Sequence, residues 1–179
     1  MEATQMIEKL RASLSGAVQA TADRFGQMEV EIGVSSLGAT LKWLKSTPGL
    51  EFDMLVDLVA IDYSSFPGWK GARFGLAYLL KSIKHGHRLQ VKAYLPEENP
   101  QAPTSTGLWS IANHLEREAF DQMGIRFTGH PNLKRILNHH EFVGHPLRKD
   151  YPITRRQWLS SNQSLMDEME LRLKERGLR

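Results

Sequence analysis

Residues 74–95 read FGLAYLLKSIKHGHRLQVKAYL, and this stretch decides the expected fold. On both sides of His85-Gly86, apolar side chains alternate with small or polar ones. Such alternation is typical of a strand with two different faces, and two such strands around a short turn predict a hairpin. We therefore expect a β-hairpin over residues 74–95, around which the other elements are placed.

The segments before this hairpin predict further helices and strands. Apolar residues at helical spacing predict an amphipathic first helix ending at Phe25-Gly26, with one face formed by Met6, Ile7, Leu10, Leu14, Ala17 and Val18. Alternating apolar and acidic residues over 28–34 predict a strand, and leucines over 37–44 predict a short helix. The second half of the apolar, β-branched run 52–62 predicts a buried strand.

The segments after the hairpin are more varied. Residues 96–107 contain three prolines and predict a loop, whereas 108–123 predict a helix that ends at Gly124. Two charge pairs at i,i+4 are expected in that helix, Arg117 with Asp121 and His114 with Glu118. From Ile125 to Trp158 no period is visible, and we call this irregular segment the strap. Ser164, resembling the start of a capping box, predicts a last helix.

Together these patterns predict an α+β fold. We expect a small mixed sheet flanked by helices, followed by an irregular extended C-terminal strap and a short terminal helix. We assign residues 1–124 to a core domain, and residues 125–179 to the partner-binding strap with the C-terminal helix, in the same structural unit.

Composition excludes several classes of site. The 179 residues include no cysteine, so this chain can hold no disulfide, thiolate metal site or cysteine-ligated iron–sulfur cluster. No apolar run approaches the ~20 residues that span a bilayer. The first residues carry an early acid and no apolar core, so we expect neither a signal nor a transit peptide. We expect a protein of a reducing aqueous compartment.

Charge is uneven along the chain. The net charge is only +3, but residues 126–156 hold seven basic and two acidic side chains. A basic block favours nucleic acid, an anionic lipid surface or an acidic partner, and a merely solvated face is the plain alternative. We expect the block to lack interleaved exposed aromatic residues, and it contains no known docking motif, so a nucleic-acid-binding module is a remote alternative.

One histidine motif fails on its spacing. His140 and His145 flank a glutamate as in a zinc-protease motif, but they are five residues apart, and Gly144 and Pro146 disfavour a helix. A non-helical metal site among the histidines stays open as an alternative. We recognise no self-contained active site in the sequence.

Two segments combine rigid turns with dense ionisable groups. Residues 116–137 read EREAFDQMGIRFTGHPNLKRIL and residues 142–152 read FVGHPLRKDYP, so Gly-His-Pro occurs twice. Proline fixes its own φ and biases the preceding histidine toward extended conformations. These turns either rigidify a surface meander or form an ordered strap that docks on an acidic partner surface.

Both segments strongly resemble the signature of the C-subunit family of NADH:quinone oxidoreductase, respiratory complex I. The resemblance covers about residues 50–155, including the run 52–63. Two positions depart from the family pattern. Gln122 stands where an apolar residue is usual, and His114-Leu115 replaces a stretch that is often aromatic.

The resemblance implies an accessory subunit of the hydrophilic arm. It implies no cofactor in this chain, with NADH, flavin, iron–sulfur clusters and quinone bound elsewhere in the parent complex. It implies docking on the quinone-site D-subunit and neighbouring iron–sulfur subunits, no nucleic acid, and indirect membrane association. The expected location is the cytoplasmic face of the bacterial inner membrane, or the mitochondrial matrix face for an organelle-encoded chain. An equivalent subunit of a membrane-bound hydrogenase or of a quinone oxidoreductase with another electron donor is the alternative.

We assign no catalytic, cofactor-binding or metal-binding residue. The residues expected to act as salt-bridge or docking groups at the partner interface are Glu116, Arg117, Glu118, Asp121, His130, Arg135, His145, Arg148, Lys149 and Asp150.

Overall fold

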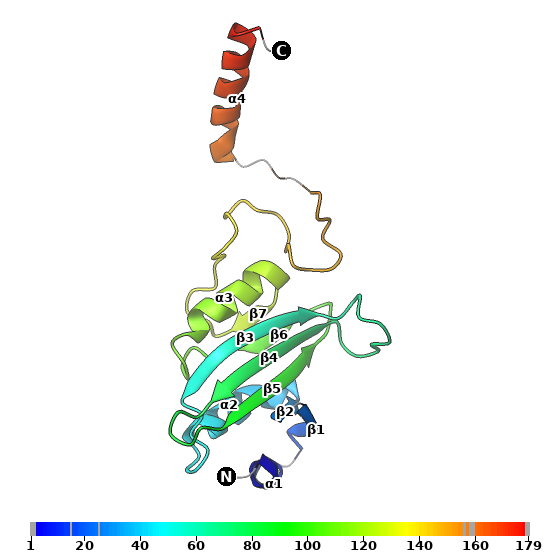
Figure 1. The fold of residues 1–179 in the computed structure, drawn as a ribbon, viewed down its shortest axis with the longest axis vertical. Helices are drawn as coiled ribbons and strands as arrows, with labels where there is room; N and C mark the ends of the chain where they lie inside the picture. Colours follow the sequence, from blue (N-terminus) through cyan, green and yellow to red (C-terminus); the bar gives the residue numbers. More distant parts are fainter. Residues whose placement is uncertain (1–2, 15, 25, 156, 158–159, 178–179) are drawn as a thin grey trace.

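The computed structural model describes residues 3–14, 16–24, 26–155, 157 and 160–177, whose arrangement is drawn in Figure 1. Residue 25 of the predicted first helix and residues 156 and 158 of the strap lie outside the described residues. The described elements are, in chain order, α1 (Ala3–Ser13), β1 (Val18–Arg24), β2 (Gln27–Ile32), α2 (Val34–Ser46), β3 (Met54–Asp62), β4 (Phe74–Lys81), β5 (Arg88–Leu95), β6 (Gln101–Pro103), α3 (Ala112–Met123), β7 (Arg126–Thr128) and α4 (Ser160–Glu175).

A five-stranded mixed sheet organises the domain. Its strand order is β1-β2-β5-β4-β3, with β2 and β5 parallel and all other neighbours antiparallel. The predicted hairpin is confirmed as β4 and β5, which pair from Phe74 opposite Leu95 to Lys81 opposite Arg88. The predicted α+β class, with a mixed sheet flanked by helices, is confirmed as well.

The core lies on one face of this sheet. Alternate residues of β4 and β5, such as Tyr78 and Val91, are fully buried there. The apolar face of α2 packs onto this layer through Leu37, Leu41 and Leu44, and α3 lies along β3. Figure 1 shows the strap leaving this layer beyond α3, with α4 standing apart from the sheet.

The first helix is shorter than predicted. α1 ends at Ser13, and Val18–Arg24 form β1, which pairs with β2 instead of extending the helix. Ala17 and Val18 have helical spacing from Leu14, which is why the pattern is misleading. Gly16 has φ +89°, and a left-handed residue at this position ends the helix.

The strand predicted as buried is an edge strand. β3 has one strand neighbour, β4, and Met54, Val56 and Val59 are 41%, 48% and 38% exposed. The second half of the run is confirmed as a strand in which Leu58 and Asp62 are buried, but Val59 is not buried. A continuous apolar run is typical of a strand covered on both faces, and this strand is not. In this chain part of the run remains uncovered on the outer face.

Three smaller predictions also need correction. The proline-rich loop contains β6, which pairs in parallel with β7 from the start of the strap. The predicted capping box is wrong, because Ser164 lies inside α4 rather than at its N-terminus. The expected i,i+4 pair of Arg117 with Asp121 is replaced by contacts of both residues with the strap. Within the described residues, no helix has the length and apolarity to cross a membrane.

Candidate functional site

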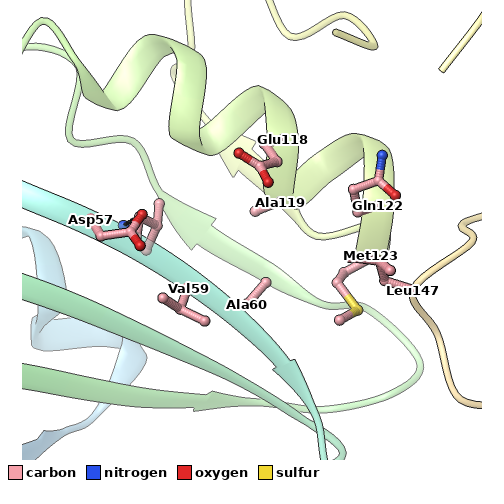
Figure 2. Close-up of a pocket in the computed structure, with 9 residues that line it drawn as sticks. Asp57, Val59, Ala60, Glu118, Ala119, Gln122, Met123 and Leu147 are labelled. Atoms are coloured by element: carbon pink, nitrogen blue, oxygen red, sulfur yellow. Dashed lines mark hydrogen bonds between the residues drawn. The ribbon is translucent and has the colours of Figure 1, made fainter. Parts of the chain in front are cut away.

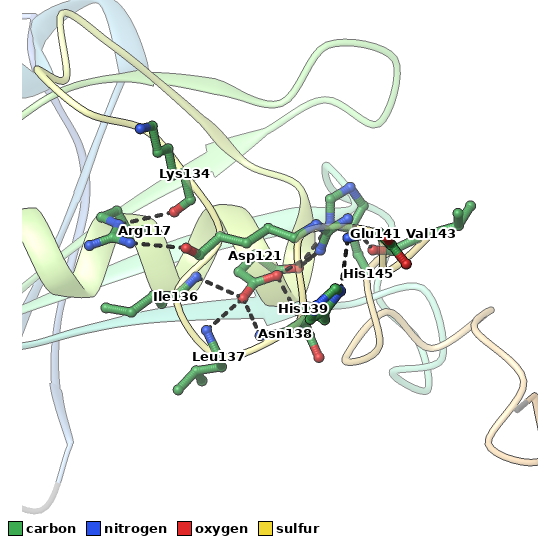
Figure 3. Close-up of polar contacts among 12 residues, drawn as sticks. Arg117, Asp121, Lys134, Ile136, Leu137, Asn138, His139, Glu141, Val143 and His145 are labelled. Atoms are coloured by element: carbon green, nitrogen blue, oxygen red, sulfur yellow. Dashed lines mark hydrogen bonds and ion pairs between the residues drawn. The ribbon is translucent and has the colours of Figure 1, made fainter. Parts of the chain in front are cut away.

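The strap is attached to the core by a buried carboxylate on α3. Asp121 is fully buried, and its Oδ1 lies 2.6 Å from Nη1 of Arg135. Its Oδ2 accepts hydrogen bonds from the backbone N–H groups of Ile136, Leu137 and Asn138 at 2.8 to 3.0 Å. Figure 3 shows these bonds converging on one side chain. One carboxylate therefore accepts the hydrogen bonds of three consecutive backbone N–H groups, which lie outside any helix or sheet.

The surroundings of Asp121 favour its ionised form. Burial alone raises the pKa of a carboxyl group, but the hydrogen bonds from Asn138, Arg135 and Leu137 outweigh burial. The pKa of Asp121 is therefore held well below its ordinary value. The strap turn is bound by a charged group at neutral pH.

A second attachment lies at the end of the sheet. Arg73 binds Asp62 through Nε at 3.2 Å and Nη2 at 3.0 Å, while Asp62 also accepts the backbone N–H of Lys149 at 2.9 Å. Arg73 also pairs with Asp150 at 2.9 Å and with Glu97. Burial raises the pKa of Asp62, but the hydrogen bonds from Arg73 and Lys149 lower the pKa by more than burial raises it. The net pKa of Asp62 therefore lies below its ordinary value. This cluster joins the strap to β3 and β4.

A third attachment covers the C-terminus of α3. Arg148 donates from Nε to the carbonyl of Met123 at 2.7 Å, and its guanidinium lies over the ring of Phe74. His145 donates from Nδ1 to the carbonyl of Asp121 at 3.0 Å. Burial and neighbouring arginines lower the pKa of His145, so a neutral imidazole with its proton on Nδ1 fits this site. Gly124 caps the helix with φ +73°, as predicted.

The remaining predicted residues divide into internally bonded and free ones. Glu116 is fully buried and accepts hydrogen bonds from Thr104 and from the backbone and hydroxyl of Ser105. Arg117 donates to the carbonyls of residues 134 and 135, and His130 contacts the carbonyl of residue 113. The side chains of Glu118 and Lys149 are exposed and have no bonding partner among the described residues.

The structure thus gives eight of the ten predicted interface residues a side-chain partner within this chain. Their contact with another protein stays a prediction. Most of these side chains bind other parts of this chain, so they hold the strap in its observed conformation.

Sequence reasoning missed the apolar side chains that the strap exposes. Leu137, Val143, Leu147 and Ile153 are 65%, 62%, 53% and 100% exposed. The available signal was four aliphatic residues in a polar, Gly/Pro-rich segment that lacks any period to bury them. Exposed apolar residues along one segment mark an interaction surface more often than scattered ones do.

Sequence reasoning also missed a pocket between β3 and α3. It is lined by Asp57, Leu58, Val59, Ala60, Glu118, Ala119, Gln122, Met123 and Leu147. Figure 2 shows Asp57 and Glu118 toward one end, with Met123 and Leu147 toward the other. The two walls come from residues about sixty positions apart, so no local pattern could have indicated it. Among the described residues, no group of three or more histidine or carboxylate side chains is placed to hold a metal ion.

Comparison with known proteins agrees with this architecture. Residues 30–157 match the family described as the respiratory-chain NADH dehydrogenase 30 kDa subunit. The C-subunit of NADH-quinone oxidoreductase from Acidithiobacillus ferrooxidans is 43% identical over 157 residues, covering 84% of this chain and 77% of that protein. Its counterpart in a Roseiflexus species is 39% identical over 148 residues, covering 83% of each chain.

Solved structures share the fold. One described as a trypsin-resistant fragment (1–134) of Nqo5 has a TM-score of 0.66 at 34% identity, covering 74% of this chain and all of that one. A chain of an archaeal membrane-bound sulfane sulfur reductase has a TM-score of 0.68 at 21% identity, covering 86% of this chain and 88% of that one. This chain therefore belongs to the family of the 30 kDa subunit of respiratory-chain NADH dehydrogenase, which is the C-subunit family of NADH-quinone oxidoreductase.

Proposed function

We propose that this chain is a cofactor-free accessory subunit of the hydrophilic arm of a proton-translocating NADH:quinone oxidoreductase. In this proposal residues 1–124 form the core, and the strap with the C-terminal helix docks on the quinone-site D-subunit and neighbouring iron–sulfur subunits. The chain supports electron transfer from NADH to quinone by holding these subunits in place. It lies at the cytoplasmic face of the bacterial inner membrane, attached through the complex alone.

One observation carries the proposal. The strap is fixed to the core by the ion pair of Arg135 with the buried Asp121 and by the backbone N–H of Lys149, which donates to the buried Asp62. It nevertheless exposes Leu137, Val143, Leu147 and Ile153. Ordering a segment costs conformational entropy, and apolar side chains that stay in water return little free energy for it. An ordered strap with exposed aliphatic side chains is therefore typical of a surface that binds a partner. Pre-ordering also lowers the entropy cost of docking.

The basic side chains of the strap favour a protein partner over nucleic acid. Arg135 and Arg148 are engaged with Asp121 and with the end of α3, so they are not free to bind phosphates. Fewer basic side chains of residues 126–156 are therefore available for nucleic acid, which weakens that alternative. The alternative of another electron donor rests on the fold shared with the sulfane sulfur reductase, and the names of the relatives favour NADH.

Affinity purification from the native membrane tests the proposal. A chain tagged at its N-terminus should retain the quinone-site subunit and the iron–sulfur subunits, and the purified assembly should contain flavin and oxidise NADH. Purification of the chain alone contradicts the proposal. Recovery with a hydrogenase or another dehydrogenase in place of the NADH-oxidising module supports the other-donor alternative.

Protease protection gives an independent readout. Lys134, Lys149 and Arg155 are exposed on the strap. Trypsin should cut the free chain at these residues and spare the core, and it should not cut them in the assembled complex. Equal cleavage rates in the free and assembled states contradict docking through the strap.

A further inference from the structure

The pocket between β3 and α3 has the features of a socket for a charged side chain. Asp57 on β3 and Glu118 on α3 both line it, and neither forms an ion pair within the described residues. The Oδ1 atom of Asp57 accepts only the backbone N–H of Leu58, at 2.8 Å. Two unpaired carboxylates on opposite walls leave negative charge that a cation would compensate.

A largely buried glutamine in the same pocket is a second feature that points to a ligand. Gln122 is only 7% exposed, and its side chain forms no hydrogen bond among the described residues. Its amide atoms are not among the fully enclosed unpartnered atoms of the described residues, so they keep contact with solvent and are available to a group that enters the pocket. Glu118 lies one helical turn before Gln122, which places both side chains on the same face of α3.

The remaining walls of the pocket are apolar. Val59, Met123 and Leu147 contribute aliphatic and thioether surface, and Figure 2 shows Met123 and Leu147 away from the two carboxylates. An arginine side chain fits both halves, because its long apolar stem packs on such surface while its guanidinium reaches the acids. The five N–H donors of the planar guanidinium can bind one carboxylate through two bonds and still reach a second carboxylate and an amide oxygen, whereas the three donors of a lysine allow one bond to each group.

The pocket is continuous with the strap. Leu147 lines it, and the backbone N–H of Leu147 donates to the carbonyl of Gln122 at 3.2 Å. A protein lying on the exposed aliphatic groups of the strap would therefore pass the mouth of this pocket. We infer that the pocket receives an arginine side chain from a neighbouring subunit of the complex, held by Asp57, Glu118 and Gln122. This inference rests on the proposed function and adds the chemistry of one contact.

The test uses the assembled complex in native membranes. The double variant Asp57→Asn/Glu118→Gln keeps shape and hydrogen-bond acceptors but removes both charges. When the salt concentration is raised, we expect the variant chain to dissociate from the complex about tenfold more readily than the wild-type chain does. Phenylglyoxal footprinting should show one partner arginine that is protected in the wild-type complex and reactive in the variant. The matched control is Glu98→Gln, an exposed carboxylate with no partner among the described residues, which should change neither readout.

A second variant separates this contact from a folding effect. Gln122→Leu removes the unpaired amide of a largely buried side chain, so it should not lower the thermal midpoint of the free chain, whereas it should weaken retention of the chain in the complex. If Gln122 has only a structural role, Gln122→Leu should change the thermal midpoint and the retention in the complex in the same direction. That result overturns the inference for this residue.

The outcomes of these tests are distinct. Unchanged salt dissociation and unchanged arginine reactivity in the double variant overturn the inference. A parallel footprint with an amine-reactive ester overturns it as well if a partner lysine, and no arginine, gains reactivity in the variant. If strap variants detach the chain while pocket variants do not, the proposed function stands and the socket fails. If the wild-type chain retains no subunit, the proposed function itself fails.

Discussion

Nη1 of Arg135 lies 2.6 Å from Oδ1 of Asp121, and this pair fixes the start of the strap to the end of α3. The same carboxylate binds three consecutive backbone N–H groups of the strap. An irregular segment is ordered here by one charged side chain rather than by a regular element.

Removing the charge of Asp121 should loosen the strap. Asp121→Asn leaves the guanidinium of Arg135 without its buried counter-ion, and breaking such a pair costs about 3 kcal/mol or more. Urea unfolding of the free chain should show this loss, and hydrogen exchange should be faster at residues 136–138. Glu98→Gln, at an exposed carboxylate with no partner among the described residues, is the control, with an expected change below about 0.5 kcal/mol. Equal stability of the two variants would contradict the anchoring role.

Acid should destabilise the fold through Asp62 and Asp121. Both have native pKa values below their ordinary value near 3.9, so the unfolded chain binds more protons in acid. Their contribution is complete above about pH 5 and is lost as pH falls toward the native pKa values. The free energy of unfolding, measured between pH 7 and pH 3, should therefore fall more steeply for wild type than for Asp62→Asn. Parallel curves would show that Asp62 gains nothing from its contacts with Arg73 and Lys149.

A side chain at position 124 should displace the strap. A Cβ on Gly124 would lie 2.5 Å from Nη2 of Arg148 and 2.6 Å from the ring of His145. Gly86 has nearly the same φ, +74° against +73°, but nothing lies within 4 Å of a Cβ there. Gly86→Ala therefore measures the conformational cost alone, about 1 kcal/mol. Gly124→Ala should cost clearly more in urea unfolding and should speed tryptic cleavage after Lys149 in the free chain, and equal costs would contradict the close approach.

Arg73 should not be replaceable by lysine. Its guanidinium reaches Asp62 twice and also Asp150, a geometry that a single ammonium cannot reproduce. Arg73→Lys should lower the free energy of unfolding by about 1–3 kcal/mol. Lys84→Arg, at an exposed ion pair with Glu51, should be near neutral. If Arg73→Lys leaves the free energy of unfolding unchanged, positive charge alone holds the strap at this end of the sheet, and the several N–H donors of the guanidinium are not required.

The sequence predicts elements whose side chains follow a period. The hairpin of β4 and β5 and the helix α2 are predicted correctly because alternate or helically spaced residues are buried. Val18 is misassigned because three- and four-residue spacing continues across Gly16, where the backbone leaves the helix. Val59 is expected to be buried because apolar continuity does not reveal whether a strand has neighbours on both sides.

The candidate site is harder to predict because its contacts join distant positions. The sequence singles out the segment 116–137, but Asp121 is expected to pair with Arg117 at i,i+4 rather than with Arg135 across the strap turn. The Asp62–Arg73 pair and the pocket of Asp57 with Gln122 depend on how β3 lies against the rest of the sheet and α3. No local spacing encodes such pairs.

The central claim, docking through the strap, is tested most directly at Ile153. Its side chain is 100% exposed, so Ile153→Asp should not change the free energy of unfolding of the free chain. Reversal of Arg148 would be a poorer test, because its half-buried side chain packs on Phe74. Ile83→Asp, at a residue 66% exposed in the β4–β5 turn, is the matched control.

The measurement is the amount of quinone-site subunit that co-purifies with each tagged chain from native membranes. The docking account predicts a loss of about tenfold or more for Ile153→Asp, with unchanged stability and with full recovery for Ile83→Asp. Full recovery of the quinone-site subunit with Ile153→Asp would contradict it.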